Sequence, residues 1–450
     1  MKRMKKKIYK AHILYTKEQS HFEVLENGYI AVEDGIVKGT STNLAELKGQ
    51  CSMCSKVNDQ WQDVEVVDFG NCLLIPAMID MHVHAPQVHN QGVAMDMELL
   101  PWLQNYTFPE EAKYADIHYA ERMYRRFMHT QWLFGTMRSC VFGTVHTEST
   151  RLLMKLYQEA GMGALVGKVA MNRHCPDNLS EDVENTVRGY ESLIEEFATP
   201  RTTTTDTSAP SAPLVRPIIT PRFVPSCTPE LLKACGQLAE KYQLPVQSHL
   251  SENTSEIAWV AELEPDSKSY GDAYNRYGLF GQTPTVMAHC VWSRDHELEL
   301  MKQNDVMVAH CPTSNFNIAS GMAPIRTFLE EGLRIGLGSD ISGGHDLNMF
   351  RIMTYSIQVS KMYYQQDHNM RFLTLPEIFW IATKSAGSFF GRVGSFEPGY
   401  EFDALVIDDA VLHPDEYSLL HRLERYICVG DDRQILHRFC RGKIVAEPKM

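Results

Sequence analysis

Eight short apolar segments recur along the chain, and stretches with a helical pattern separate them. The segments are residues 73–80, 136–143, 164–171, 216–223, 244–250, 285–290, 306–311 and 334–340. Strands that alternate with helices in this way predict an α/β fold with a parallel sheet. Eight such units predict a (β/α)8 TIM barrel, in which functional side chains lie at the carboxyl ends of the strands. An open doubly wound sheet is the alternative, but no glycine-rich dinucleotide-binding motif follows the first segment.

Both ends of the chain contain sequences typical of antiparallel strands. Asp34-Gly35 separates two β-rich runs, which is a strong hairpin pattern, and Arg441-Gly442 separates two further runs near the other end. We therefore expect the two ends to form one small composite β-domain. The expected bounds are 1–72 and 396–450 for the β-domain and 73–395 for the barrel.

Composition and charge narrow the classes of function. Hydrophobic residues make up 44% of the chain and charged residues 22%, as in ordinary globular proteins, and no apolar run is as long as a membrane-spanning helix. The net charge of -13 argues against a nucleic-acid polymer as a partner. We expect a cytoplasmic protein that acts on a small molecule. The C-terminal PKM resembles a peroxisomal tripeptide only loosely.

Two further features are expected to have no catalytic role. The 11 cysteines occur without a secretion signal, so we expect reduced thiols rather than a disulfide framework. Cys51 and Cys54 form a lone C-x-x-C pair, whereas a zinc knuckle would need a second pair. Residues 199–213 are rich in threonine and low in complexity, which predicts an exposed, mobile loop.

Histidine or aspartate stands at the end of five of the eight segments. These residues are His82 and His84 after the first segment, then His249, His289, His310 and Asp340 at the fifth to eighth. His82 and His84 are two positions apart, so in extended chain their side chains point to the same face. The parallel strands of a barrel all end on the same face. Five strand endings of this kind therefore indicate a shared site rather than five coincidences.

Imidazole nitrogens with one carboxylate suit a borderline divalent ion, zinc above all or iron(II). A coordination position left open to water would make the site catalytic, because the ion lowers the pKa of its bound water toward ~7. The sequence therefore predicts a metal-dependent hydrolase.

The motifs resemble those of the amidohydrolase superfamily over nearly the whole chain, and within it those of the guanine deaminase family. The motifs that carry the resemblance are PAMIDMHVHAPQ (76–87), YTFPEE (106–111), TVHTEST (144–150), TPRFVPSC (220–227), SHLSEN (248–253), VMAHC (286–290), AHCPTSNFNIASG (309–321) and GLGSDISGG (336–344). The resemblance implies hydrolytic deamination of guanine to xanthine and ammonia, a step of purine catabolism, by a homodimer with one zinc per subunit.

The resemblance also implies a ligand set. It assigns the zinc to His82, His84, His249 and Asp340. His289 would position the attacking water or join the metal shell. Some members of the superfamily hold two ions bridged by a carboxylated lysine after the fourth strand. Here Arg222 stands at that place and Lys168 lies one strand earlier, so a mononuclear site is expected.

Glu252 follows His249 by three residues and is the expected proton shuttle. It would carry a proton from water to N3 of guanine while C2 is attacked, with Asp340 as a second base. A helix cap or a loop acid is the alternative reading of Glu252. The resemblance implies that Gln87 binds the purine and that Arg222 donates to its C6 carbonyl.

The remaining substrate contacts are expected from Phe223, as an apolar wall, and from His249, Glu252 and Asp340. His310 would either bond the substrate or support Asp340, and His146 would shape the mouth. The chain departs from the usual family run near the second segment, where it has GTMRS (135–139). Two alternatives remain: a deaminase of another aminated purine, pyrimidine or triazine on the same site, and a catalytically silent scaffold.

Overall fold

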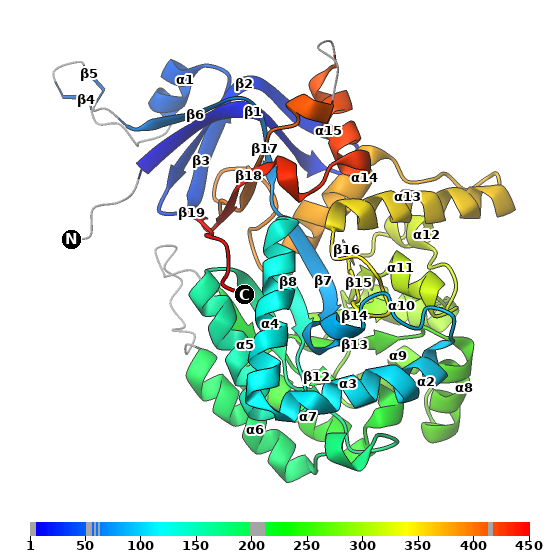
Figure 1. Cartoon of the computed structure of the whole chain (residues 1–450). Helices are drawn as coiled ribbons and strands as arrows, with labels where there is room; N and C mark the ends of the chain where they lie inside the picture. The colour runs from blue at the N-terminus through cyan, green and yellow to red at the C-terminus, as the bar shows by residue number, and fades with distance from the viewer. Residues whose placement is uncertain (1–5, 51–55, 58–59, 62–63, 199–211, 413–416) are drawn as a thin grey trace. The chain divides into compact units, whose positions relative to one another are not determined.

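The computed structural model describes residues 6–50, 56–57, 60–61, 64–198, 212–412 and 417–450 (Figure 1). Cys51, Cys54 and residues 199–211 of the threonine-rich segment lie outside the described residues. The chain divides into two compact units. The first contains residues 1–79, 130–137 and 348–447, and the second contains residues 80–129, 138–347 and 448–450.

One seven-stranded sheet, in the order β19-β18-β17-β6-β1-β2-β3, forms the centre of the first unit (Figure 1). Its strands are β1 (Lys6–Glu18), β2 (His21–Glu33), β3 (Ile36–Ser41), β6 (Val66–Pro76), β17 (Ala404–Ile407), β18 (Ile435–Cys440) and β19 (Lys443–Ile444). The sheet thus contains strands from both ends of the chain. Tyr9 on β1 packs against Phe402 and Phe439 in its core, with ring centroids 5.1 and 5.3 Å apart.

Both expected turns are present in this sheet. The turn between β2 and β3 is formed by Asp34 and Gly35, with φ angles of 51° and 83°. Arg441 and Gly442, with φ angles of 47° and 71°, connect β18 to β19 in the same way. Glycine readily adopts the left-handed region that a tight hairpin requires, and each turn has one. The antiparallel pairing of β2 with β3 and of β18 with β19 confirms both hairpin predictions. This unit also contains β4 (Lys56–Val57), β5 (Gln60–Trp61), α1 (Leu44–Gln50), α13 (Met349–Gln366), α14 (Leu375–Trp380) and α15 (Leu419–Val429).

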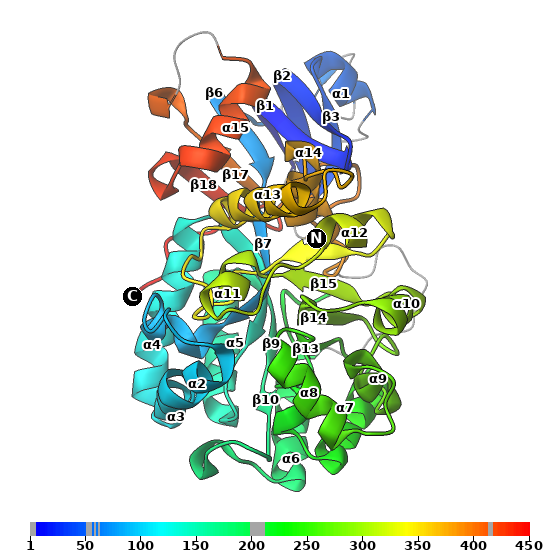
Figure 2. The same ribbon diagram turned by 90° about the vertical axis from the view of Figure 1, so that its right-hand side faces the viewer.

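Two four-stranded parallel sheets, ordered β11-β9-β8-β7 and β13-β14-β15-β16, lie mostly in the second unit. Their strands are β7 (Met78–His84), β8 (Thr136–Phe142), β9 (Gly163–Gly167), β11 (Val215–Pro217), β13 (Val246–Leu250), β14 (Thr285–His289), β15 (Met307–His310) and β16 (Ile335–Leu337). A further parallel pair joins β10 (Val169–Ala170) to β12 (Thr220–Pro221). Figures 1 and 2 show helices around these strands.

The helices of this part are α2 (Leu99–Trp102), α3 (Phe108–Ala112), α4 (Ile117–Leu133), α5 (Thr147–Ala160), α6 (Val183–Phe197), α7 (Pro229–Tyr242), α8 (Thr254–Leu263), α9 (Tyr270–Arg276), α10 (Asp295–Gln303), α11 (Pro312–Asn317) and α12 (Ile325–Glu330). Local sequence fixes several of their ends. The Thr228 side chain accepts the Leu231 N–H at the start of α7, where Pro229 is the first helical residue, and α5 ends at Gly161 with φ 72°. Within the described residues, no helix has the length and apolar character needed to cross a membrane.

The first strand differs from its expected bounds. Residues 73–80 are divided between β6, which ends at Pro76, and β7, which begins at Met78. Pro76 has no N–H with which to continue the ladder. Asp80 does not end the strand, because its buried carboxylate accepts hydrogen bonds from Ser339 and from the His82 N–H. His82 and His84 therefore belong to β7 itself rather than to the loop after a strand.

The third and fourth segments are also divided. Residues 164–171 form β9 and β10, and residues 216–223 form β11 and β12. Pro217 and Pro221 end the two short strands of the fourth segment, and each lacks the backbone donor that a longer strand would need. Arg222 and Phe223 consequently follow β12 in irregular chain.

Candidate active site

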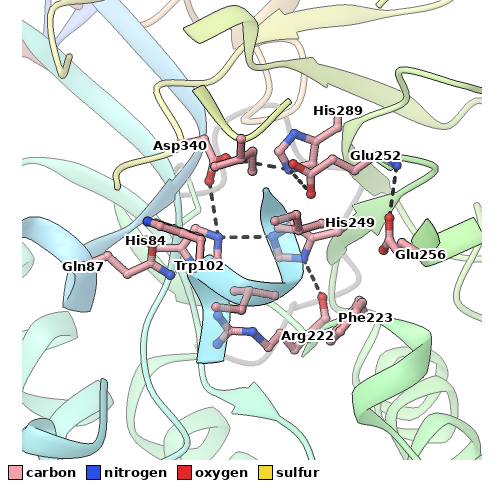
Figure 3. Close-up of a pocket in the computed structure, with 13 residues that line it drawn as sticks. His84, Gln87, Trp102, Arg222, Phe223, His249, Glu252, Glu256, His289 and Asp340 are labelled. Carbon is pink, nitrogen blue, oxygen red and sulfur yellow. Dashed lines mark hydrogen bonds and ion pairs between the residues drawn. The ribbon is translucent and has the colours of Figure 1, made fainter. Parts of the chain in front are cut away.

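One cavity of about 420 Å³ brings most of the expected functional residues together (Figure 3). Its walls are His84, Gln87, Leu99, Trp102, Leu103, Arg222, Phe223, His249, Glu252, Glu256, His289, Ile318 and Asp340. All these residues belong to the second unit. An apolar wall with a few converging polar groups is typical of small-molecule sites. His82 does not line the cavity.

A cluster of histidines and one aspartate lies at one side of the cavity. Two overlapping groups can hold an ion, His82, His84 and His249, and His82, His289 and Asp340; in each group the ligand atoms lie within 4.8 Å of one another. His82 Nε2 is 3.1 Å from Asp340 Oδ1, and His84 Nε2 is 3.1 Å from His249 Nε2. His289 Nε2 is farther away, 3.8 Å from Asp340 Oδ2.

Hydrogen bonds at Nδ1 determine which nitrogen of two rings faces the cluster. His249 Nδ1 lies 2.6 Å from the backbone carbonyl of Arg222. A carbonyl only accepts, so Nδ1 carries the proton and Nε2 presents a lone pair toward His84. His289 Nδ1 is bonded in the same way to Asn315 Oδ1, at 2.9 Å. Both rings are thereby fixed with Nε2 as the available ligand atom.

The charge state of the cluster also suits a metal ion. Burial, together with the charge of His82, lowers the pKa of His84 and His249 well below the ordinary value, so their imidazoles are neutral at pH 7. Burial opposes ionisation of Asp340, but His82, His289 and His84 outweigh it and hold its pKa far below the usual range. Among the described residues, His82 Nε2 and His289 Nε2 have carboxylate oxygens 3.1 and 3.4 Å away but no hydrogen bond of good geometry. Neutral imidazoles, an ionised carboxylate and unsatisfied buried nitrogens fit a divalent ion.

A second carboxylate, Glu252, lies beside this cluster. Its Oε2 is 3.4 Å from His289 Nε2, and Ser320 Oγ donates to its Oε1 at 3.1 Å. The backbone N–H of Glu252 donates to Glu256 Oε2 at 3.2 Å, which holds the start of α8 (Figure 3). Burial and the negative charge of Asp340 raise the pKa of Glu252 well above its ordinary value. A carboxyl whose pKa is raised in this way holds a proton more readily than an exposed glutamate, which suits a group that transfers protons.

Two polar groups project from another wall of the cavity and share one carboxylate. Gln87 Nε2 donates to Glu111 Oε1 at 2.8 Å, and Arg222 Nη1 donates to Glu111 Oε2 at 2.5 Å. Gln87 Oε1 accepts the backbone N–H of Ser342 at 2.9 Å. Phe223, which is almost fully buried, supplies an apolar surface next to them.

Comparison with known proteins decides the family. The model of the amidohydrolase family matches residues 73–445, which is most of the chain. The chain belongs to the amidohydrolase family. The guanine deaminase of Dictyostelium discoideum is 36% identical over 448 residues and is matched over 97% of both chains. The probable guanine deaminase of Schizosaccharomyces pombe is 37% identical, over 83% of this chain and 71% of its own length.

Solved structures agree with this assignment. The crystal structure of guanine deaminase from C. acetobutylicum with bound guanine in the active site is 45% identical, with a TM-score of 0.90, and is matched over 98% of this chain and 100% of that one. The resemblance to the guanine deaminase family inferred from the motifs is thereby confirmed. This amidohydrolase has the mixed α/β fold of its family.

Several residues of the site had no role assigned from the sequence of this amidohydrolase. Leu99, Trp102 and Leu103 form an apolar wall of the cavity, together with Ile318. The first three stand at positions i, i+3 and i+4, a helical spacing that places them on one face and that the sequence does display. Glu111 is different. Its motif YTFPEE is one of those that resemble the guanine deaminase family. The sequence alone does not show that the Glu111 carboxylate contacts Gln87 and Arg222.

Other residues that the sequence singled out lie outside the cavity wall. His310 is buried, burial lowers its pKa to about 3, and its ring nitrogens have no hydrogen-bond partner among the described residues. Lys168 is fully buried and forms an ion pair with Glu181, which accounts for it as a structural residue. His146 is only half-buried, at the start of α5, and its position gives no sign of a catalytic role.

Proposed function

We propose that this amidohydrolase converts guanine and water to xanthine and ammonia. The observation that carries the proposal is that one cavity holds a cluster suited to a metal ion, the buried carboxyl of Glu252, and the paired donors Gln87 and Arg222. The names of its relatives, and the guanine bound to the C. acetobutylicum enzyme, support the same substrate.

The proposed ligands of a single divalent ion are His82, His84, His249 and Asp340. Neutral nitrogen ligands with one carboxylate favour zinc, with iron(II) as the alternative. When bound, such an ion supplies Lewis-acid activation of a water molecule. His289, fixed through Asn315, directs its Nε2 at the side of the cluster where Glu252 and Asp340 also lie. It would orient the attacking water by a hydrogen bond.

Glu252 carries the proton transfers in this proposal. Its carboxylate takes one proton from the attacking water and delivers it to N3 of guanine while oxygen bonds to C2. The remaining hydroxyl proton then passes to the amino group, with Asp340 as the second base, as the C2–N bond breaks and ammonia leaves. Protonation of N3 prevents an anion from building up on the ring, and this proton stays on N3 in xanthine.

Recognition of the ring is assigned to the wall that contains Gln87 and Arg222. Arg222 donates to the C6 carbonyl oxygen, and Gln87 uses the N–H that Glu111 does not accept. Phe223 and Trp102 offer flat apolar surfaces, suited to a heterocycle. His249, Glu252 and Asp340 complete the contacts near the reacting carbon.

The domain organisation is part of the proposal. We infer that the two parallel sheets form a (β/α)8 barrel, supported by a bridge between Ile219 and Val246 and by the hydrogen bond from the Asp340 N–H to the His82 carbonyl, 2.9 Å. The proposed bounds are 73–395 for the barrel and 1–72 with 396–450 for the composite β-domain. The homodimer and the cytoplasmic location stay predictions.

A substrate panel tests the function. Purified, zinc-loaded protein is given guanine, adenine, cytosine or an aminotriazine, and ammonia is measured with the product identified. We expect rapid release from guanine, with xanthine as product, and release from the others slower by orders of magnitude. Preference for another ring would leave the fold and cluster in place and overturn the guanine assignment. Zinc binding without ammonia from any compound would support a silent scaffold.

A further inference from the structure

Glu111 lies behind the substrate wall of the cavity and contacts both residues proposed to bind the purine. We propose that Glu111 is a positioning residue. It holds Gln87 and Arg222 so that they present two adjacent N–H donors to the cavity, and the site thereby selects rings with an oxygen at C6. The inference rests on the proposed function. It concerns how the site distinguishes guanine from rings with a different edge.

The Glu111 carboxylate accepts a hydrogen bond at each of its two oxygens. Glu111 belongs to the short helix α3, and its side chain is 2% exposed. Each of its oxygens accepts from a different donor, Gln87 Nε2 at 2.8 Å and Arg222 Nη1 at 2.5 Å. The donors come from chain segments more than 100 residues apart, and this carboxylate bonds to both.

Glu111 fixes the orientation of the Gln87 amide. The Gln87 oxygen accepts the Ser342 N–H at 2.9 Å, while the nitrogen donates to Glu111. Rotation of the amide by half a turn would set its oxygen against the carboxylate and its NH2 group against the Ser342 N–H. Both contacts would be repulsive, so the amide is held in one orientation. The second N–H of Gln87 is then the group available to a ligand.

Glu111 also neutralises Arg222. The guanidinium is 3% exposed, and an unpaired charge at such depth is costly. Phe108, on the same helix as Glu111, lies under the guanidinium with its ring centroid 5.1 Å from Cζ. Helix α3 therefore holds Arg222 by both a carboxylate and an aromatic face, and leaves the other N–H groups of its planar fork to the cavity side.

Two adjacent donors require two adjacent acceptors on the ligand. Guanine presents O6 and N7, which are both acceptors, on one edge. A purine with an amino group at C6 presents a donor beside N7. That donor would face one of the two fixed donors of the wall, and the two N–H groups would repel each other. A purine without any C6 substituent loses one of the two bonds. Glu111 accounts for this selectivity without touching the substrate.

The test compares Glu111→Gln with Glu110→Gln. Glu110 is the matched control because it neighbours Glu111 on α3, is equally buried, and binds Lys113 at 2.6 Å and Tyr119 rather than residues of the cavity wall. The ligands are guanine and 2-aminopurine, which has the same 2-amino group but no C6 oxygen. Guanine is measured by kcat and KM, and 2-aminopurine by its inhibition constant against guanine.

We expect Glu111→Gln to raise the KM for guanine by about 10- to 100-fold, because charge-assisted contacts of this kind contribute about 1.5–3 kcal/mol. The inhibition constant of 2-aminopurine should rise by a clearly smaller factor, because this ring keeps only the N7 contact, and Glu110→Gln should leave both constants near wild type. Equal losses for the two ligands, or an unchanged KM for guanine, would overturn the inference.

Two measurements keep the test decisive. If Glu111→Gln does not fold, Glu111→Asp retains the charge but shortens the reach to both donors, and the same divergence of the two constants is expected. Wild-type protein is assayed alongside. An inactive wild type would refute the proposed function itself, whereas an active wild type with parallel losses in the variant would refute only the role of Glu111.

Discussion

At the scale of single residues, the site depends on which atom of each side chain is already engaged. His249 and His289 use Nδ1 for protein acceptors and turn Nε2 to the cluster, and Gln87 uses one of its two N–H groups for Glu111. The sequence predicted most of these side chains because they close successive strands. It could not show Asn315 or Glu111 as their partners, since those contacts join segments far apart in the chain.

Replacement of the proton shuttle should remove turnover and leave the protein intact. Glu252→Gln keeps the size and the hydrogen bond from Ser320 but cannot move a proton. We expect kcat to fall by about 100-fold or more, the usual range for a general acid–base residue, with zinc content and melting temperature close to wild type. A variant that keeps more than a tenth of the wild-type kcat would remove Glu252 from this role.

The anchor of His289 should matter for rate rather than for folding. Asn315→Leu removes the acceptor of the Nδ1 proton, whereas Asn315→Asp keeps an acceptor in the same place. We expect a loss of about 10- to 100-fold in kcat for leucine, as for other partners that orient ring ligands, and a much smaller loss for aspartate. The steady-state kcat of each variant is compared with that of the wild type. Equal losses for leucine and aspartate would contradict a role for the Asn315–His289 hydrogen bond.

At the scale of elements, buried polar groups explain where strands and helices begin and end. Asp80 lies inside β7 because Ser339 satisfies its carboxylate, and burial still raises its pKa to about 6. In the sequence, Asp80 follows an apolar run and is predicted to end the strand. The strand continues because Ser339, 259 positions away, satisfies the Asp80 carboxylate. Local signals such as Asp34-Gly35 were sufficient where the interaction itself was local.

The start of α8 gives a prediction about pH. Glu256 Oε2 accepts the backbone N–H of Glu252 and of Asn253, and Oε1 accepts Tyr270 Oη–H. Burial, with the charge of Glu252, raises its pKa from 4.5 to about 7, although Tyr270, His289 and the Asn253 N–H oppose this. The folded state therefore binds this proton more tightly than the unfolded state, and its stabilising effect is lost as the pH rises from about 4.5 through 7.

The consequence is measured with Glu256→Gln, which does not titrate. The melting temperature of the wild type should fall relative to that of the variant between pH 5 and pH 8, by an amount corresponding to about 3 kcal/mol at most. Melting curves at several pH values in one ionic strength give the difference directly. A difference that stays constant, or that grows in favour of the wild type, would contradict the raised pKa.

At the scale of the whole molecule, apolar segments and residue types at their ends were enough to indicate parallel strands and a metal-binding cluster. The number of segments did not reveal that prolines divide two of them. A β-domain built from both ends was expected from the hairpin patterns, but the order in which β6 pairs with both β1 and β17 was not, because these pairings join distant parts of the chain. Leu99, Trp102 and Leu103 have helical spacing in the sequence, but the sequence does not show that they line the cavity.

Metal removal should affect the protein in a reversible way. Chelation is expected to abolish ammonia release and to lower the melting temperature, because an ion that binds only the folded state stabilises it. Zinc should restore both, whereas magnesium should not, since it prefers oxygen ligands and the cluster offers three or more nitrogens. Activity and melting curves of the same samples test this, and full activity in metal-free protein would refute a catalytic ion.

Hydrolysis of guanine at C2 is the proposed reaction of this site. Zinc-loaded protein is incubated with guanine in water enriched in oxygen-18, and xanthine and ammonia are quantified by mass spectrometry and an ammonia assay. We expect one ammonia per xanthine, with one heavy oxygen in each xanthine, and almost no product from Glu252→Gln. Folded, zinc-loaded wild type that leaves guanine unchanged would contradict it.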